Sequence, residues 1–248
     1  MEETSVSPSP APPGAPPVFH QWPKLVRFSI FATLFWLAEF AVQYWWLTNG
    51  NLASALLRSY ALAGASLIGL ALFSSALFKW VPRLAVHWHT RRRLGVAGVI
   101  LISFHILWAY VTIFHSQLTL AYFSFNPLEN PVIFGSFAYL ILLIMAITSN
   151  EWMVRKLTPK VWKRVHRFVY LAYWAAIFHF LTMNSRLLKN PAGILLLLIT
   201  AAALFGELFW YVRLAWKKRF RSQGAWVGLA IIILYIVTGI IVYRYRHP

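Results

Sequence analysis

The sequence predicts an all-α fold, a polytopic transmembrane bundle of about seven helices, and three observations support this prediction. Hydrophobic residues make up 60% of the 248 residues, charged residues make up 12%, and the mean hydropathy is +0.62. A water-soluble domain of this size cannot bury so much apolar surface, whereas a bilayer requires about 20 apolar residues for each spanning helix. The apolar residues also fall in separate runs of that length, which excludes a soluble globule.

The N-terminal region differs from the rest in composition. Residues 5–17 are rich in Pro, Ser and Ala and carry no charge, so we expect residues 1–22 to form a disordered tail. The apolar run Leu25–Leu47 is too long for a signal peptide and lacks a small-residue cleavage site. We therefore expect residues 23–52 to hold the first transmembrane helix.

Six further apolar runs of about 18–25 residues predict the remaining helices, because Pro, Gly, Asn or basic residues separate them. Four of these runs fall within residues 53–183, and residues 184–248 hold two further C-terminal transmembrane helices. The runs cover residues 53–78, 94–114, 132–149, 165–183, 192–212 and 225–243.

The basic residues indicate the orientation of these helices. The chain has 23 Lys and Arg against six Asp and Glu, a formal net charge of +17, and all but five of the basic residues lie at one end of the predicted bundle. The positive-inside rule then places the N-terminus in the cytoplasm and the C-terminus outside. We expect an integral protein of a bacterial inner membrane that contacts lipid and binds no nucleic acid. The five exceptions are Arg58, Arg186, Lys189, Arg244 and Arg246.

The chain contains no cysteine, which excludes disulfides, iron–sulfur clusters and covalently attached c-type haem. Any metal must therefore be bound by histidine or oxygen. No dinucleotide fingerprint or P-loop is present, and the connecting loops are short. Any chemistry takes place in the membrane or is supplied by a partner protein.

Two of the eight histidines lie deep in predicted spans. His105 follows Arg93 by about 12 residues, or roughly 18 Å of helix, and His179 follows Arg164 by about 15 residues. Because both spans run from inside to outside, the two imidazoles reach comparable depth and can bind one iron from both sides. The alternative is two separate polar residues, each hydrogen-bonded across the bundle.

Small residues on the same helix faces as these histidines leave room for a porphyrin between the helices, although they also suit close helix packing. These residues are Gly98, Ala109, Ala172, Ala175 and Ala176.

His166 precedes His179 by 13 residues, which is about 19.5 Å along an ideal helix and near the cytoplasmic face. This spacing suggests a second metal site. The two side chains would point about 140° apart, however, so a second haem needs a kink or a differently facing slot. The alternative is an interfacial residue that meets lipid headgroups.

Three stretches resemble the ferric-reductase-like transmembrane domain family: residues 91–95 followed by His105, residues 148–149, and residues 155–170 followed by His179. Within this family the chain most resembles the MsrQ type, the haem b membrane subunit of periplasmic methionine sulfoxide reductase. The resemblance covers about residues 53–183 and implies a haem-binding core. In this core His105 and His179 are axial ligands of haem b, and His166 is a further candidate ligand, for a second haem.

Several charged residues are candidates for contacts with an anionic cofactor. NADPH oxidases carry a second histidine on the helix that corresponds to the third span, whereas Arg91 or Arg92 occupies that inner position here. Arginines suit haem propionates or the phosphate of FMN. Arg58 would also pair with a propionate, or extend to the interface. Glu39 would relay protons or pair with Arg58, and Glu207 would meet interfacial water.

The resemblance implies a haem b electron-transfer subunit, an oxidoreductase component that needs separate redox partner proteins. Electrons would come from a cytoplasmic flavin/NAD(P)H or quinol donor and pass to an outer-face acceptor, a methionine sulfoxide reductase-like oxidoreductase or ferric iron. The alternatives are a proton-coupled transporter and a cofactor-free structural subunit. A Soret band that responds to dithionite is expected only for the first.

The orientation is open to a direct test. We expect reporter fusions after Pro248 and after Glu129 to be active in the periplasm and a fusion near Lys160 to be inactive there, because the basic clusters stay in the cytoplasm. The opposite pattern of reporter activity would invert the orientation.

Overall fold

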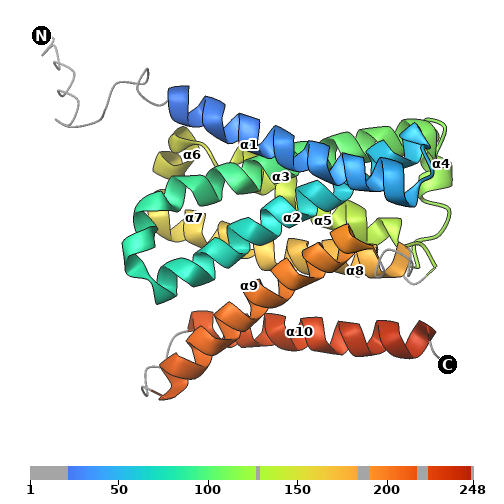
Figure 1. The fold of residues 1–248 in the computed structure, drawn as a ribbon. Coiled ribbons are helices and arrows are strands. Elements are labelled where there is room, and N and C mark those ends of the chain that lie inside the picture. The colour runs from blue at the N-terminus through green and yellow to red at the C-terminus, as the bar shows by residue number, and fades with distance from the viewer. Residues whose placement is uncertain (1–21, 127–128, 184–189, 217–222, 247–248) are drawn as a thin grey trace, which may run out of the picture.

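The computed structural model describes residues 22–126, 129–183, 190–216 and 223–246, and this part of the chain is all-helical (Figure 1). The predicted tail lies outside it, apart from Trp22. The elements are α1 (Trp22–Ala41), the π-helical turn η2 (Val42–Leu47), α2 (Leu52–Trp80), the 3₁₀ turn η3 (Pro82–His87), α3 (Trp88–Thr112), α4 (Leu118–Ala121), α5 (Val132–Ile147), α6 (Glu151–Lys156), α7 (Thr158–Arg167), α8 (Val169–Met183), α9 (Pro191–Trp216) and α10 (Gln223–Arg246).

The long helices run back and forth along one direction (Figure 1). The start of α1, η3, α6 and α7 lie at one end of the bundle, and η2, α4 and the C-terminus lie at the other. Helices α3 and α8 therefore run in the same direction, as the sequence predicts. The basic clusters at the start of α3 and in α6 and α7 share one end, and the positive-inside rule predicts that this end is cytoplasmic.

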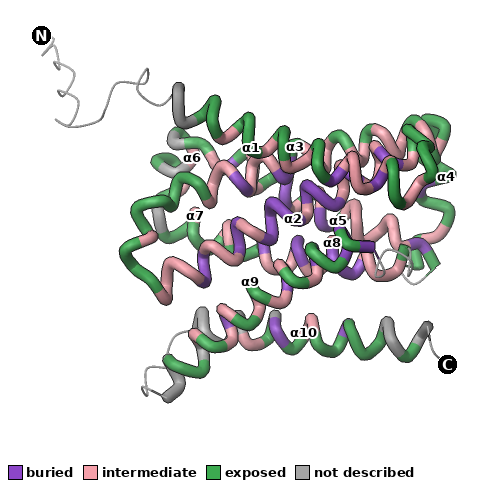
Figure 2. The backbone as a smooth tube through the Cα atoms, in the orientation of Figure 1, coloured by how far each residue is buried: buried purple, intermediate pink, exposed green. Residues whose placement is uncertain are grey.

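Helix α2 is the centre of the fold. In the apolar segment of α2, 61% of the residues are buried inside the protein, whereas 6% are buried in the apolar segment Leu25–Leu47. The buried residues gather along α2 and the helices beside it (Figure 2). Its small residues allow this close packing: a Cβ at Gly98 of α3 would lie 2.7 Å from the carbonyl oxygen of Gly64. The expectation that Gly98 leaves room for a cofactor is therefore wrong, because it packs against α2.

Four helices in the described ranges are long and apolar enough to cross a membrane: Leu25–Leu47, Leu52–Trp80, Pro82–Thr112 and Pro191–Trp210. Val132–Ile147 and Ile232–Ile241 are shorter apolar helices. The protein is thus an integral membrane protein, and the full count of seven spans remains a prediction.

The predicted run 165–183 is not one helix. It is divided at Phe168, where the basic helix α7 ends and the apolar helix α8 begins. The physical reason is that charged side chains such as Arg164 and Arg167 cannot enter the apolar layer without large cost. His166 therefore lies on a different helix from His179.

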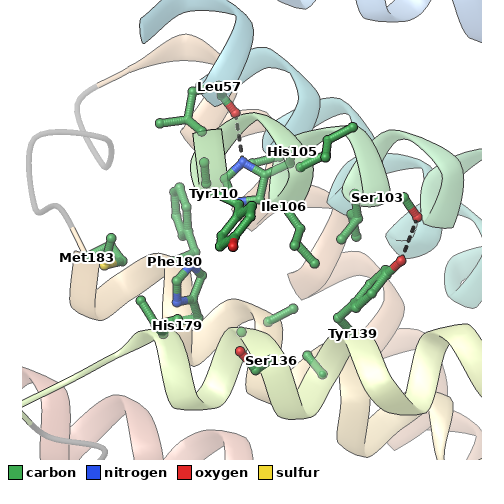
Figure 3. Close-up of a pocket in the computed structure, with 18 of the residues that line it drawn as sticks. Leu57, Ser103, His105, Ile106, Tyr110, Ser136, Tyr139, His179, Phe180 and Met183 are labelled. Carbon is green, nitrogen blue, oxygen red and sulfur yellow. Dashed lines mark hydrogen bonds between the residues drawn. The ribbon is translucent and has the colours of Figure 1, made fainter. Parts of the chain in front are cut away.

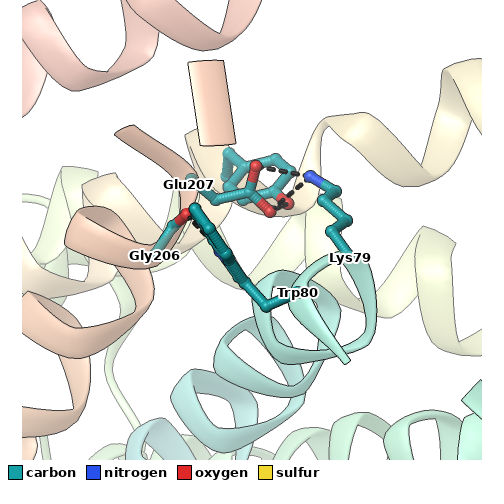
Figure 4. A network of polar contacts seen from close by, with 5 residues as sticks. Lys79, Trp80, Gly206 and Glu207 are labelled. Atoms are coloured by element: carbon teal, nitrogen blue, oxygen red, sulfur yellow. Dashed lines mark hydrogen bonds and ion pairs between the residues drawn. The ribbon is translucent and has the colours of Figure 1, made fainter. Parts of the chain in front are cut away.

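At the inner end of the bundle an ion pair joins α2 to α9 (Figure 4). The Lys79 ammonium lies 2.7 Å from Oε1 of the buried Glu207, and the Tyr170 hydroxyl of α8 donates to the same oxygen at 3.1 Å. The expectation that Glu207 meets interfacial water is wrong, because its carboxylate is satisfied inside the protein. The adjacent Trp80 indole donates to the Gly206 carbonyl at 3.2 Å.

We expect Lys79→Met to destabilise the detergent-solubilised protein by roughly 1–3 kcal/mol, because it leaves the Glu207 carboxylate buried without its cation. The double variant Lys79→Met/Glu207→Leu should recover at least half of this loss, since no charge is then left unpaired. Thermal unfolding of both single variants and the double variant measures the coupling. Additive losses would show that the pair contributes nothing.

Candidate functional site

The two deep histidines border one cavity of about 680 Å³, enclosed by α2, α3, α5 and α8 (Figure 3). A volume of this size is typical of sites for cofactors and other small ligands. His105 comes from α3 and His179 from α8, so the structure brings together the pair that the sequence singles out. Small residues from all four helices make the room: Ala61, Ala65, Ala109, Gly135, Ala138 and Ala176.

The orientation of His105 is fixed by a backbone group of the neighbouring helix. Its Nδ1 lies 2.9 Å from the carbonyl oxygen of Leu57 on α2 (Figure 3). A carbonyl oxygen only accepts hydrogen bonds, so Nδ1 carries the proton and donates. In the neutral ring this leaves Nε2 as the basic atom with a free electron pair.

His179 is held in the same way from another helix. Its Nδ1 donates to the carbonyl oxygen of Pro131, just before α5, at 2.9 Å. Gly135 lies one turn further along, and a Cβ added there would lie 3.2 Å from the imidazole ring, so a side chain at this position would require the ring to move by a few tenths of an ångström. A histidine whose Nδ1 donates to a carbonyl and whose Nε2 is basic is the usual form of a metal ligand.

No group of three or more His, Asp or Glu side chains that could hold a metal ion occurs among the described residues. The cavity thus offers two imidazole ligands and otherwise mostly apolar walls. This donor set fits a metal whose remaining ligands come from a macrocycle, and the cavity volume and small lining residues also fit a planar porphyrin. The residues of this site therefore satisfy the requirements of a bis-histidine haem.

Few polar groups line the cavity apart from the two histidines. Arg58 of α2 borders it. The Ser103 and Tyr139 hydroxyls lie 3.1 Å apart across α3 and α5 (Figure 3). Because these two hydroxyls form a hydrogen bond with each other, neither is left unsatisfied in the cavity wall.

The remaining candidates form a separate group at the end of the bundle that carries the basic clusters. His166 does not border the cavity: its Nε2 lies 3.2 Å from the Ser149 hydroxyl, its Nδ1 lies 3.1 Å from the Trp162 carbonyl, and its ring stacks on the Trp162 indole at 3.9 Å. Burial lowers the pKa of His166, and the charges of Arg91 and Arg92 lower it further, so its imidazole is neutral at pH 7. Both ring nitrogens of His166 already have polar partners.

Some residues of the site have no signature in the sequence. The carbonyl groups of Leu57 and Pro131 fix the two imidazoles, but a backbone carbonyl is present at every position. One feature of the sequence could have indicated the cavity. Gly135 and Ala138 are small residues one turn apart in an apolar run, and both line the cavity. Among the small residues singled out, Ala109 and Ala176 line the cavity, whereas Ala172 and Ala175 are not part of its lining and are fully buried.

Comparison with known proteins gives consistent matches. Residues 61–177 match the family described as ferric reductase like transmembrane component. This segment contains His105 and His166 and ends two residues before His179.

Several relatives carry the name protein-methionine-sulfoxide reductase heme-binding subunit MsrQ, and three of them are described here. The protein of Caulobacter vibrioides is 28% identical over 174 residues, 64% of this chain and 78% of the relative. That of Rhizobium meliloti is 32% identical over 147 residues, 56% of this chain and 61% of the relative. That of Agrobacterium fabrum is 32% identical over 105 residues, and the match spans 41% of this chain and 46% of the relative, less than half of its length.

Proposed function

Since residues 61–177 belong to the ferric reductase-like transmembrane component family, we propose that this protein is a haem b electron-transfer subunit of a bacterial inner membrane. One observation carries the proposal: two imidazoles from parallel helices border one cavity, each with Nδ1 bonded to a carbonyl and Nε2 left basic. The haem-binding core is residues 53–183, with the remaining helices added at either side.

In this proposal His105 and His179 would hold the haem, which would supply a one-electron redox couple. The Leu57 and Pro131 carbonyls keep each ring in the correct tautomer and raise the basicity of Nε2. The apolar walls exclude water and so influence the reduction potential. Arg58 would neutralise a propionate at the edge of the cavity.

The relatives named as subunits of a protein-methionine-sulfoxide reductase support a partner of that kind, an oxidoreductase at the outer face. Ferric iron is the other acceptor consistent with the family. The donor is a cytoplasmic flavin/NAD(P)H-dependent protein or a membrane quinol. His166, with Arg91 and Arg92 nearby, is the candidate inner site for a second haem on the cytoplasmic route. The relatives' names mention haem and not FMN, so FMN is left out of the proposal.

We expect His105→Ala and His179→Ala each to lose the low-spin b-type spectrum and most of the haem, because a haem bound between two helices needs both axial bonds. Both variants should still insert, since removal of an imidazole makes the span more apolar. The Soret band and the pyridine haemochromogen assay measure haem content. His87→Ala, an exposed histidine outside the cavity, is the matched control and should retain full haem. Full haem in either axial variant would refute the pairing.

A second prediction concerns the packing of His179. Gly135→Val adds a side chain whose Cβ lies 3.2 Å from the imidazole, so the ring must shift and its bond to Pro131 must weaken. We expect haem content to fall at least about threefold while the protein remains folded. Gly95→Val on α3, where nothing lies within 4 Å of an added Cβ, is the control for a β-branched residue in a helix. Equal haem content in the two variants would contradict the role assigned to Gly135.

A further inference from the structure

Helix α7 carries four basic side chains on one face, which we call the basic stripe. Its members are Lys160, Lys163, Arg164 and Arg167, and all four are exposed. They occupy positions i, i+3, i+4 and i+7, so they follow one another along a single side of the helix. The basic stripe lies at the same end of the bundle as η3 and α6 (Figure 1), and none of its residues borders the histidine cavity.

The opposite face of α7 is fixed to the rest of the protein. The Trp162 indole donates to the Thr148 carbonyl at 3.0 Å, and His166 Nε2 lies 3.2 Å from the Ser149 hydroxyl, just beyond the end of α5. Trp162, Val165 and His166 are half-buried on this face. These contacts set the rotation of α7, so the basic stripe points away from α5.

The cations of the basic stripe have no acidic partner in the described part of the chain. The ion pair found there joins Lys79 to Glu207, and it involves no residue of the stripe. The sequence has no Asp or Glu between Glu151 and Glu207. Like charges one turn apart destabilise a helix, and an anion from outside the chain removes this repulsion.

The length of α8 determines how deep the basic stripe lies in a membrane. Helix α8 (Val169–Met183) has 15 residues, or about 22 Å of helix, and Asn184 follows it in the sequence. The hydrocarbon layer of a bilayer is about 30 Å thick. An apolar helix shorter than this layer brings its flanking polar residues to the lipid headgroups. Arg167 and Arg164, the first charged residues before α8, therefore lie at the depth of the lipid phosphates.

An apolar edge lies beside the basic stripe. Val161 and Phe168 are 41% and 55% exposed, and both lie on the same side of α7 as Arg164, at i−3 and i+4. On α6 the Trp152 ring is 60% exposed and has the Lys156 ammonium 4.7 Å from its centroid, which is typical of the membrane interface. Cations next to exposed apolar side chains match a lipid, whose phosphate adjoins acyl chains, better than they match an acidic water-soluble protein.

We propose that the basic stripe binds the phosphate groups of anionic phospholipids, whose acyl chains lie against Val161 and Phe168. Arginine donates two parallel hydrogen bonds to a phosphate, and lysine adds a compact positive charge. The bound headgroups hold the junction of α7 and α8 at one depth in the bilayer, and α8 carries His179. The inference is independent of the proposed function, because it involves neither haem nor electron transfer.

The test measures lipid binding to the purified full-length protein by native mass spectrometry. Phosphatidylglycerol is the anionic probe, and phosphatidylethanolamine is the zwitterionic one. We expect the wild-type protein to prefer phosphatidylglycerol at least about fivefold, and Arg164→Gln/Arg167→Gln to lose most of this preference. The matched control, Arg155→Gln/Lys156→Gln, removes the same charge from exposed positions of α6 and should keep most of the preference.

Three results would overturn the proposal. The first is equal wild-type affinity for the two lipids, and the second is an unchanged preference in Arg164→Gln/Arg167→Gln. The third is an equal loss in the α6 control, which would indicate a diffuse charge effect and no defined site. Binding of a polyglutamate peptide that phosphatidylglycerol does not displace would assign the stripe to an acidic protein instead.

A depth measurement that does not depend on lipid affinity accompanies it. The chain contains no cysteine, so Phe168→Cys and Val161→Cys each accept one spin label at a known position. In nanodiscs the label at position 168 should collide more often with oxygen than with a water-soluble nickel chelate, because it faces the acyl chains. At position 161 the two collision rates should be similar, as at headgroup depth. A label at position 161 as accessible to the chelate as a free label would place α7 in water and contradict the proposal.

Discussion

The site depends on one constraint, that an imidazole buried in a membrane must satisfy both of its nitrogens. His105 and His179 satisfy Nδ1 through bonds to the carbonyls of Leu57 and Pro131, and Nε2 is the nitrogen that remains for a ligand in the cavity. The arrangement therefore requires four helices to keep their positions, two that carry the histidines and two that carry the carbonyls. Each carbonyl precedes its histidine by 48 residues, so the pairs α2/α3 and α5/α8 build the two sides of the cavity in the same way.

Close packing keeps these helices in register. Gly64 and Gly98 bring α2 and α3 together, Gly135 brings α5 against the His179 ring, and the pair of Lys79 and Glu207 joins α2 to α9 at the inner end. Polar groups at these contacts are satisfied within the protein, which is what a bilayer requires of a stable interior. Among the described residues, buried side-chain atoms without a partner remain in the segment Leu25–Leu47, on Trp36, Glu39 and Gln43, and on α2, at the hydroxyls of Ser66 and Ser75.

The sequence was sufficient for the features that depend on composition along one segment. Apolar runs between basic clusters predicted the helices and their direction, and the similar distances of 12 and 15 residues from Arg93 and Arg164 predicted that His105 and His179 reach comparable depth. Features that depend on contacts between distant segments could not be predicted. Glu207 finds Lys79 across 128 residues, and Gly98 faces α2 although it lies on the same helix as His105. The division at Phe168 follows from the competition between helix continuity and the cost of burying arginine, which spacing along the chain does not reveal.

The position of the cavity has a further energetic consequence. Both histidines lie in the outer parts of their helices, near the end that carries few basic residues. In a membrane that is negative inside, an electron that moves outward gains about 2.3 kcal/mol for each 100 mV of membrane potential when no other charge crosses with it. A second site at His166, at the basic end of the bundle, would shorten the path of such an electron to the cavity.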